Sequence, residues 1–274
     1  MTPLGQQTIL ITGATDGLGR HLAEHLARSG ARLLLHGRDA GRGAQTVRSI
    51  SSATGNERVE FVQADFASLA EVRAMGATLA GKLKRLDALV NNAGIGSGGR
   101  SATRELSRDG IELRFAVNYL APFVLTRALL ELLERSAPAR IVNVASAGQQ
   151  ALDFNDLMLE RGFSGWRAYC QSKLAQILFT FDLAAELRAT GVTVNCLHPS
   201  SLMPTKMVMQ AYGHAMSTIE QGVEATARLV TDPALDTVTG RYFDVLRAAK
   251  ADPQAYDVTA RRALRAATER LVGM

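Results

Sequence analysis

The chain has 274 residues, of which 47% are hydrophobic, and a formal net charge of +5. This length suits one large α/β core, and no low-complexity linker interrupts it, so we expect a single domain over residues 1–274. The Arg residues are scattered along predicted helices without interleaved aromatic residues, which argues against nucleic-acid binding and favours a solvated basic surface. The two cysteines, Cys170 and Cys196, lack metal-binding spacing, so we predict buried thiols and no metal site.

The N-terminal segment gives an expectation about localisation. The first apolar strand run begins at Thr8, which leaves no room for a signal peptide. No apolar run approaches the roughly 20 residues that are required to cross a bilayer. We therefore expect a cytoplasmic protein with no membrane partner.

Short apolar runs alternate with helical-period segments along the whole chain. The expected strands are 8–12, 32–36, 59–63, 88–91, 141–144, 193–197 and 242–245. The expected helices are 20–29, 42–52, 68–83, 104–135 (with a bend at Pro122) and 166–188. Near-continuous apolar strands are typical of parallel sheets covered on both faces. The pattern predicts an α/β fold: a single doubly wound Rossmann-type domain with about seven parallel strands and helices on both faces.

A Gly-rich turn, TGATDGLG at 12–19, lies between the first strand and an amphipathic helix. Glycines let the backbone approach a pyrophosphate, and the helix N-terminus stabilises its charge. The spacing is GxxxGxG, not the GxGxxG fingerprint, and an ordinary strand–helix turn is the alternative; the position in the chain favours the dinucleotide. We assign cofactor contacts to Gly13, Thr15, Asp16, Gly17, Leu18 and Gly19.

The end of the second strand reports on the choice between the two nicotinamide cofactors. It ends in His36-Gly37-Arg38-Asp39, where an acidic residue would favour NAD(H). Arg38 can instead pair with a 2′-phosphate, which favours NADP(H). Asp39 leaves NAD(H) as the alternative, unless it caps the next helix. We therefore predict NADP(H), with NAD(H) less favoured.

Two further strand ends carry residues that suit the rest of a dinucleotide. Asp65, followed by Phe66, can accept from an adenine amino group, or it can instead cap the helix that begins near Ser68. The fourth strand ends in NNAG, where small residues allow a sugar and nicotinamide ring to lie against the backbone. We add to the predicted cofactor contacts Asp65, Phe66, Asn92, Ala93 and Gly94.

Four polar side chains can perform proton transfer. Tyr169 and Lys173 share one helix face at i, i+4, and a nearby ammonium lowers the pKa of a phenol. A tyrosine so tuned acts as general acid or base. Ser146, just past the fifth strand, can stabilise charge on the reacting oxygen, or it can cap a turn. Asn118 lies within a helix, where it either opens a bend that holds a water towards Lys173 or is a buried structural residue.

Together these residues resemble the short-chain dehydrogenase/reductase family. The matching features are TGATDGLG, NNAG, Asn118, Ser146 and YCQSK, in the family's order over residues 8–205. The segment LDFNDL at 152–157 and the helix YCQSKLAQILFTFDLAAEL resemble the branch that is similar to retinol dehydrogenases and WW-domain oxidoreductases.

The resemblance implies hydride transfer between nicotinamide and an apolar ketone, aldehyde or secondary alcohol. It implies that Tyr169 exchanges the proton, Ser146 polarises the carbonyl, Lys173 holds the nicotinamide ribose and Asn118 supports the relay. Tyr169, Lys173, Pro199 and Ser201 then also contact the cofactor. The run His198-Pro199-Ser200-Ser201 departs from the family's Pro-Gly, so the nicotinamide-side loop differs there. A non-catalytic NADP(H)-binding redox sensor or scaffold is the rival hypothesis, but such a protein would lose the acid/base residues that are present.

The segment near 200–222 is expected to cover the substrate, because it follows the sixth strand and contains several methionines. The predicted substrate contacts are Gln149, Phe154, Met203 and Met207, although packing in the core is an equal alternative for the apolar ones. Helices near 106–133 and 166–188 are apolar on more than one side and so need a second partner. We therefore predict a homodimer or homotetramer, with a monomer covered by a C-terminal segment as the competing outcome.

Overall fold

The computed structural model describes residues 2–99 and 101–274. Its centre is one sheet with the strand order β3-β2-β1-β4-β5-β6-β7-β8. The strands are β1 Thr8–Ile11, β2 Arg32–Gly37, β3 Val59–Gln63, β4 Ala88–Asn91, β5 Ala139–Val144, β6 Val192–His198, β7 Tyr242–Asp244 and β8 Arg247–Ala249. All neighbours are parallel except β8, which pairs antiparallel with β7. Seven parallel strands were predicted correctly, and the eighth was missed because it is a three-residue edge strand without an apolar run.

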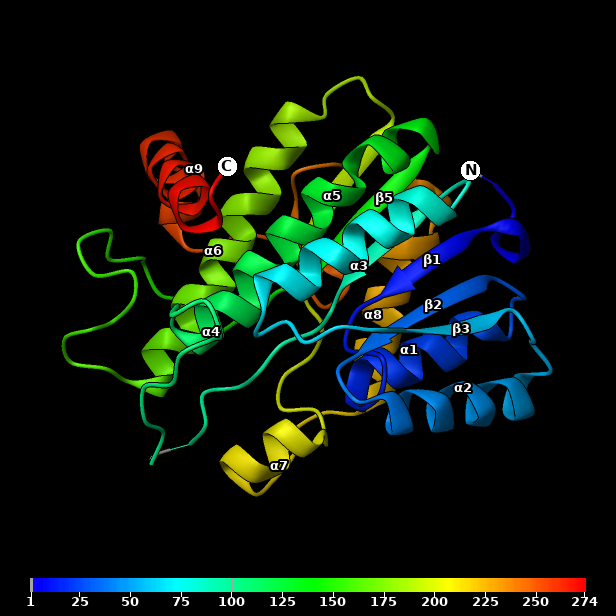
Figure 1. Ribbon diagram of the computed structural model, residues 1–274, viewed down its shortest axis with the longest axis horizontal. Coiled ribbons are helices and arrows are strands. Elements are labelled where there is room, and N and C mark those ends of the chain that lie inside the picture. Colours follow the sequence, from blue (N-terminus) through cyan, green and yellow to red (C-terminus); the bar gives the residue numbers. More distant parts are fainter. Residues whose placement is uncertain (1, 100) are drawn as a thin grey trace.

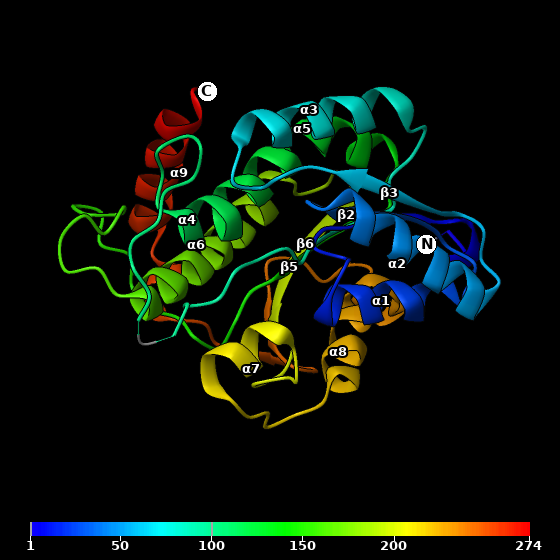
Figure 2. The same cartoon turned by 60° about the horizontal axis from the view of Figure 1, so that its bottom comes forward.

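The helices cover both faces of the sheet, as predicted (Figures 1 and 2). They are α1 Gly17–Ala27, α2 Ala40–Thr54, α3 Leu69–Lys82, α4 Leu113–Phe115, α5 Ala121–Arg135, α6 Gly165–Glu186, α7 Lys206–Tyr212, α8 Ile219–Thr231 and α9 Val258–Val272. Helices α1, α2 and α8 pack on one face, and α3, α5 and α6 on the other. Figure 2 shows α7 standing away from the sheet on the side where the strands end.

The predicted helix over 104–135 is wrong in its first part. Residues before α4 form a turn in which the Ser107 N–H donates to the Ile111 carbonyl at 2.7 Å. The Glu112 carboxylate then caps the helix by accepting from the Phe115 N–H at 2.8 Å. A π-helical turn, Ala116–Leu120, joins α4 to α5, and Pro122 lies in the first turn of α5. The irregularity is therefore centred on Asn118, four residues before Pro122, and a π-turn at this place accommodates the N–H that the proline lacks.

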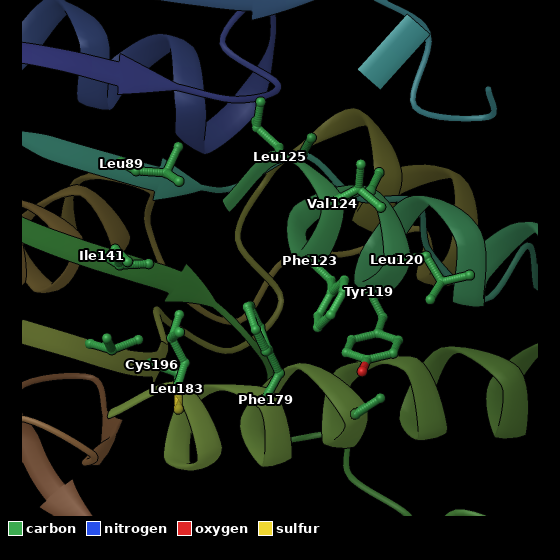
Figure 3. Packing of buried hydrophobic residues seen from close by; sticks show 14 of the residues in the cluster. Leu89, Tyr119, Leu120, Phe123, Val124, Leu125, Ile141, Phe179, Leu183 and Cys196 are labelled. Atoms are coloured by element: carbon green, nitrogen blue, oxygen red, sulfur yellow. The ribbon is translucent and has the colours of Figure 1, made fainter. Parts of the chain in front are cut away.

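The continuous helical stretch Leu113–Arg135 also corrects our expectation about apolar length. It has 23 residues, and an 18-residue window within it has a mean hydropathy of 1.4, so by length and composition it could cross a membrane. In this fold 78% of that window is buried inside the protein. Figure 3 shows the reason: Tyr119, Phe123 and Phe179 pack between this stretch and α6, next to Leu89 and Ile141 of the sheet. A core helix of an α/β fold passes the same length test as a membrane span.

Candidate active site

The Gly-rich turn connects the carboxyl end of β1 to α1. Gly13 and Gly17 adopt positive φ values of 65° and 50°, which glycine tolerates without cost. A Cβ on Gly13 would lie 2.7 Å from the Cα of Ala93, so the turn is packed directly against the end of β4. The N–H groups of the first turn of α1, including Leu18 and Gly19, point out of the helix without intrahelical acceptors. This arrangement suits a phosphate group.

The end of β4 is tied to the same turn by side chains. The Asn92 amide donates to the carbonyls of Thr12 and Gly13 at 2.8 and 3.1 Å. The Thr12 hydroxyl accepts from the N–H groups of Asn92 and Ala93, both at 2.9 Å. Asn91 instead turns to the neighbouring strand and bonds Asn143 at 2.8 Å. The two asparagines thus connect the end of β4 to the ends of β1 and β5, and Thr12 is a contributor that sequence reasoning missed.

His36, at the end of β2, contacts the backbone of the Gly-rich turn. Its Nδ1 lies 3.3 Å from the Gly13 N–H and its Nε2 lies 3.0 Å from the Ala64 carbonyl. The ring stacks on Phe66 with centroids 4.1 Å apart. Burial lowers the pKa of His36 to about 4, so the neutral ring accepts from Gly13 and donates to Ala64. Its position in the sequence gave no signal for this role.

The end of β2 presents a free cation and an engaged carboxylate. Arg38 is exposed and forms no ion pair with the residues that the structure describes. The Asp39 carboxylate accepts from the Arg42 N–H at 2.8 Å and caps α2. A Cβ on Gly37 would lie 2.7 Å from Thr15, so no side chain fits at that position. Asp39 therefore takes the capping role that had been the alternative to a contact with NAD(H).

The Asp65 carboxylate is held within the loop that follows β3. It accepts from the Ala67 N–H at 3.0 Å and pairs with Arg108 at 3.3 Å. The residue that caps α3 is Ser68, so the capping alternative for Asp65 is wrong. An Asx-type turn satisfies the carboxylate locally and leaves it at the edge where adenine is expected.

Tyr169 and Lys173 lie on one face of α6, facing the end of β5. The Tyr169 ring is half-buried, and the Lys173 Nζ lies 6.0 Å from its centroid. Ser146 is buried just past β5, where its hydroxyl accepts from the Gly148 N–H at 3.0 Å. The Lys173 ammonium donates to the Val144 carbonyl at 2.8 Å. Three of the four side chains predicted for proton transfer therefore share one location.

The pKa values of this pair are set by desolvation. Burial raises the pKa of Tyr169 to about 12, and hydrogen bonding with Ser146 acts in the opposite direction. Burial lowers the pKa of Lys173 to about 8. Our expectation that Lys173 lowers the pKa of Tyr169 is wrong for this arrangement, because the ammonium is turned towards Val144 and the phenol is shielded from water.

Asn118 connects the π-helical turn to the loop that follows β4. Its Oδ1 accepts from the Ile95 N–H at 2.8 Å, and its Nδ2 donates to the Ile95 carbonyl at 3.1 Å and to Ser172 at 2.9 Å. A Cβ on Gly94 would lie 3.2 Å from Asn118 Oδ1 and 3.6 Å from Lys173 Nζ. A side chain at residue 94 would therefore crowd Asn118 and contact the Lys173 ammonium. The helix is distorted at Asn118 and the side chain is fully buried, as the structural alternative expected, whereas a water held towards Lys173 stays a prediction.

The predicted substrate residues divide between the site and the core. Met203 is buried in the cluster between the sheet and helices α1 and α8, where a Cβ on Gly222 would lie 2.3 Å from its sulfur. For Met203 the core-packing alternative applies, and the prediction of a substrate contact is wrong in this arrangement. Met207 is 40% exposed on α7 and contacts Gly96. Phe154 packs against the edge of the main core.

Gln149 connects the loop after β5 to the C-terminal segment. Its Nε2 donates to the Ser146 carbonyl at 2.9 Å, and its Oε1 accepts from the Asp252 N–H at 2.7 Å. Both ends of the amide are therefore engaged in holding the Ser146 loop. On the opposite side, Trp166 is 50% exposed and stacks on Tyr169 with ring centroids 6.0 Å apart.

The segment after β6 folds back over the phosphate turn. Pro199 is buried, and Ser201 bonds His198 at 3.1 Å. Thr205 caps α7, and its methyl group lies 3.2 Å from where a Cβ on Gly17 would be. The start of the segment 200–222 therefore lies against the phosphate turn, and its predicted role in covering the substrate stays a prediction.

Comparisons with known proteins agree with this geometry. A family model described as short chain dehydrogenase matches residues 7–215. The chain is 34% identical to human retinol dehydrogenase 13 over 98% of this chain and 85% of that protein. An uncharacterised Mycobacterium paratuberculosis protein superposes with a TM-score of 0.78 at 29% identity, covering 98% of this chain and 94% of that one. A Shigella flexneri short chain dehydrogenase complexed with NADP has a TM-score of 0.72 at 27% identity, covering 88% of this chain and 98% of that one.

Proposed function

The chain belongs to the short-chain dehydrogenase family, in the branch of the retinol dehydrogenases, and from this premise we propose an NADP(H)-dependent oxidoreductase. Its substrate is an apolar ketone or aldehyde, or the corresponding secondary alcohol. The observation that carries the proposal is the meeting of Tyr169, Ser146 and Lys173 beside the Gly-rich turn. A proton donor, a hydroxyl that can bond an oxyanion and a cation are thus gathered at the carboxyl ends of β1, β4 and β5.

The residues present fit a phosphorylated dinucleotide. The positive φ values of Gly13 and Gly17 open the first turn of α1 to a pyrophosphate. The exposed Arg38 suits a 2′-phosphate, whereas the carboxylate of Asp39 is used in capping α2. Because residue 94 is a glycine, no side chain at this position crowds Lys173, beside which we place the ribose and nicotinamide. The NADP bound to the Shigella flexneri relative supports the same choice.

The chemistry assigned to the chain is proton transfer and charge stabilisation. When bound, NADPH supplies a hydride from its nicotinamide ring to the substrate carbon. The Tyr169 hydroxyl donates its proton to the substrate oxygen, and the Ser146 hydroxyl donates a hydrogen bond to that same oxygen. The raised pKa of Tyr169 keeps the phenol protonated and ready to donate at neutral pH. In the reverse direction the phenol must lose its proton before it can act as base.

An apolar substrate is supported by the surroundings of Tyr169. Trp166 and Met207 expose apolar surface next to the site, and Phe154, in the loop between β5 and α6, packs against the main core. The similarity to a retinol dehydrogenase makes retinal and retinol suitable members of a test panel.

The first test is NADPH oxidation with aliphatic, aromatic and polycyclic carbonyls, including retinal, by wild type and Tyr169→Phe. The variant keeps the ring that stacks on Trp166 but lacks the proton donor. We expect turnover to fall about 10²-fold or more with NADPH affinity nearly unchanged. Equal turnover by both proteins on every active substrate would refute the role of Tyr169. NADPH binding with no turnover of any carbonyl or alcohol would favour the non-catalytic redox sensor or scaffold.

The second test concerns the cofactor. Arg38→Ala removes the cation proposed to pair with the 2′-phosphate. We expect its NADPH affinity to fall about tenfold or more while its NADH affinity changes little, because only NADPH carries that phosphate. Cofactor fluorescence titrations measure both constants. A matched control is Arg42→Ala, because Arg42 is a nearby exposed cation that faces Asp39. An equal loss of both affinities in Arg38→Ala would contradict the assignment.

A further inference from the structure

Arg114 and Glu112 form a buried ion pair close to the site, and neither residue has a role in the proposed proton transfer or cofactor binding. Arg114 and Glu112 are 3% and 1% exposed, and their side chains lie 3.2 Å apart. The Glu112 carboxylate also caps α4 by accepting from Phe115. Burying two charges is costly unless their hydrogen bonds are satisfied, so the remaining donors of Arg114 need a structural explanation.

The remaining donors of Arg114 are used on one short loop. Its Nε donates to the Gly96 carbonyl and its Nη2 to the Ser97 carbonyl, both at 3.1 Å. The guanidinium also lies 5.6 Å from the centre of the Phe163 ring. The loop 95–98 follows Gly94, the position where the nicotinamide end of the cofactor is expected. Arg114 thus joins the loop 95–98 to the segment that leads into α6.

Arg114 and Asn118 act on neighbouring residues of the same loop. They are four residues apart on one helical stretch, so their side chains share a face. Asn118 binds both backbone groups of Ile95, and Arg114 binds the next two carbonyls. The helical stretch therefore fixes three consecutive residues of the loop. An Asn118 side chain alone would leave Gly96 and Ser97 without these partners.

The loop 95–98 contacts two elements that flank the site, α7 and the start of α6. A Cβ on Gly96 would lie 2.8 Å from Met207 of α7, the segment predicted to cover the substrate. A Cβ on Gly165 would lie 2.1 Å from the Ser97 carbonyl, so the loop also touches the start of α6. The loop 95–98 is thus a spacer between α7 and the helix that carries Tyr169.

We propose that Arg114, neutralised by Glu112, is a positioning residue that holds the loop 95–98 and thereby sets the distance between Met207 and the substrate. The expected effect on KM rests on the proposed oxidoreductase function, whereas the expected effect on the loop 95–98 does not. Arg114 touches neither the reacting atoms nor the phosphate turn. Its loss acts on the binding of the apolar substrate, with the cofactor site unchanged.

The test variant is the double substitution Glu112→Gln, Arg114→Met. Gln retains an oxygen that can cap Phe115, and removal of both charges leaves no buried unpaired ion. The matched control is Arg140→Met, Asp236→Asn. Arg140 is also 3% exposed and donates to two backbone carbonyls, of Leu229 and Asp232. It lies near the start of β5, at the opposite end of the sheet from the site.

Two measurements separate the outcomes. Hydrogen exchange of peptides covering 94–99 is expected to become at least about tenfold faster in the test variant and to stay unchanged in the control. The KM for the best carbonyl substrate is expected to rise about tenfold in the test variant, with kcat and NADPH affinity within about twofold of wild type. Both are measured well below the melting temperature of each variant.

Unchanged exchange in 94–99, or an equal rise of KM in the control, would overturn the proposal. If wild type turns over no substrate, the proposed function fails, and the exchange measurement alone decides whether Arg114 holds the loop. The single variant Arg114→Met provides a further arm, because it leaves Glu112 charged. It is expected to exchange at least as fast over 94–99 as the double variant.

Discussion

At the scale of single residues, desolvation opposes the simple picture of an ammonium that acidifies a phenol. Lys173 donates to Val144 and lies 3.4 Å from the Gln176 amide oxygen, both in the protein interior. The same burial that lowers the pKa of Lys173 raises that of Tyr169. The Tyr169 phenol therefore stays protonated over the physiological pH range, whereas the Lys173 ammonium titrates close to that range.

The pH dependence of carbonyl reduction follows from the Lys173 pKa of about 8. Because that pKa is lowered, the amine is charged below about pH 8 and neutral above it. We expect kcat/KM for reduction to be flat below about pH 8 and to fall above it, since kcat/KM reports on the free enzyme. Tyr169, with a pKa of about 12, does not ionise in this range. A profile that stays flat to pH 10 would show that the charge of Lys173 is not required.

His36 makes a separate prediction about stability. Its pKa is about 4 in the folded protein and near 6.5 in the unfolded chain, so the unfolded chain binds more protons between these values. The free energy of unfolding therefore falls as the pH decreases from about 6.5 to 4, by about 3 kcal/mol from this residue. In His36→Gln the side chain cannot titrate, but it can still accept from Gly13 and donate to Ala64. Urea unfolding at several pH values should give a shallower pH dependence for the variant.

The buried His198 also has a lowered pKa, so some acid sensitivity remains in His36→Gln. A variant with the full wild-type pH dependence would mean that His36 does not carry the effect. A loss of NADPH affinity below pH 5 in wild type but not in the variant would further connect the ring to the turn at Gly13.

At the scale of elements, the sequence predicted the structures whose signals are local. The parallel strands are apolar runs, and the Gly-rich turn, NNAG and YCQSK fall at strand or helix ends where the fold requires them. The start of α4 was misplaced because the turn at 107–111 and the Glu112 cap depend on contacts with Ala67 and the buried Arg114. Helices α7, α8 and α9 were not predicted as elements, since α7 is short and α9 is strongly polar on one face.

The same distinction applies to the site. Residue types that carry proton transfer were identifiable, because few side chains can do this chemistry. The supporting residues were not: Thr12, His36 and Arg114 act through backbone groups that are distant in sequence. The pKa of Tyr169 was predicted with the wrong sign, because desolvation depends on three-dimensional packing. The sequence pattern therefore identified the candidate proton-transfer residues, but their pKa shifts could be read only from the three-dimensional structure.

At the scale of the whole molecule, α9 changes the argument for oligomerisation. We predicted a homo-oligomer because α6 is apolar on more than one side. In the structure α9 packs along α6 (Figure 1). The Tyr119 hydroxyl bonds Thr268 at 2.7 Å, and the Arg265 guanidinium pairs with Asp182 at 2.7 Å. Phe181 of α6 packs against Tyr256, with ring centroids 5.3 Å apart. The second apolar side of α6 thus has a partner within the chain.

Because α9 covers one side of α6, its removal is expected to change the oligomeric state of the protein. A chain that ends at Asp257 would expose the buried hydroxyl of Tyr119 and the apolar face of α6. We expect the full chain to sediment as a monomer and the shortened chain to associate as its concentration rises, because a large exposed apolar patch favours a self-complementary contact. Analytical ultracentrifugation of both chains measures this directly.

The point variant Leu264→Ala distinguishes a packed cover from a loosely attached helix. Leu264 is 2% exposed on the side of α9 that faces the core. Its truncation should lower the free energy of unfolding by about 2–4 kcal/mol if α9 is part of the cooperative fold. The exposed Arg262 on the same helix provides the control, since Arg262→Ala should change stability by less than about 0.5 kcal/mol. If the full chain and the shortened chain instead form the same dimer, the association surface lies elsewhere on the molecule. In the full chain, α9 would then cover the apolar side of α6 without help from a second copy.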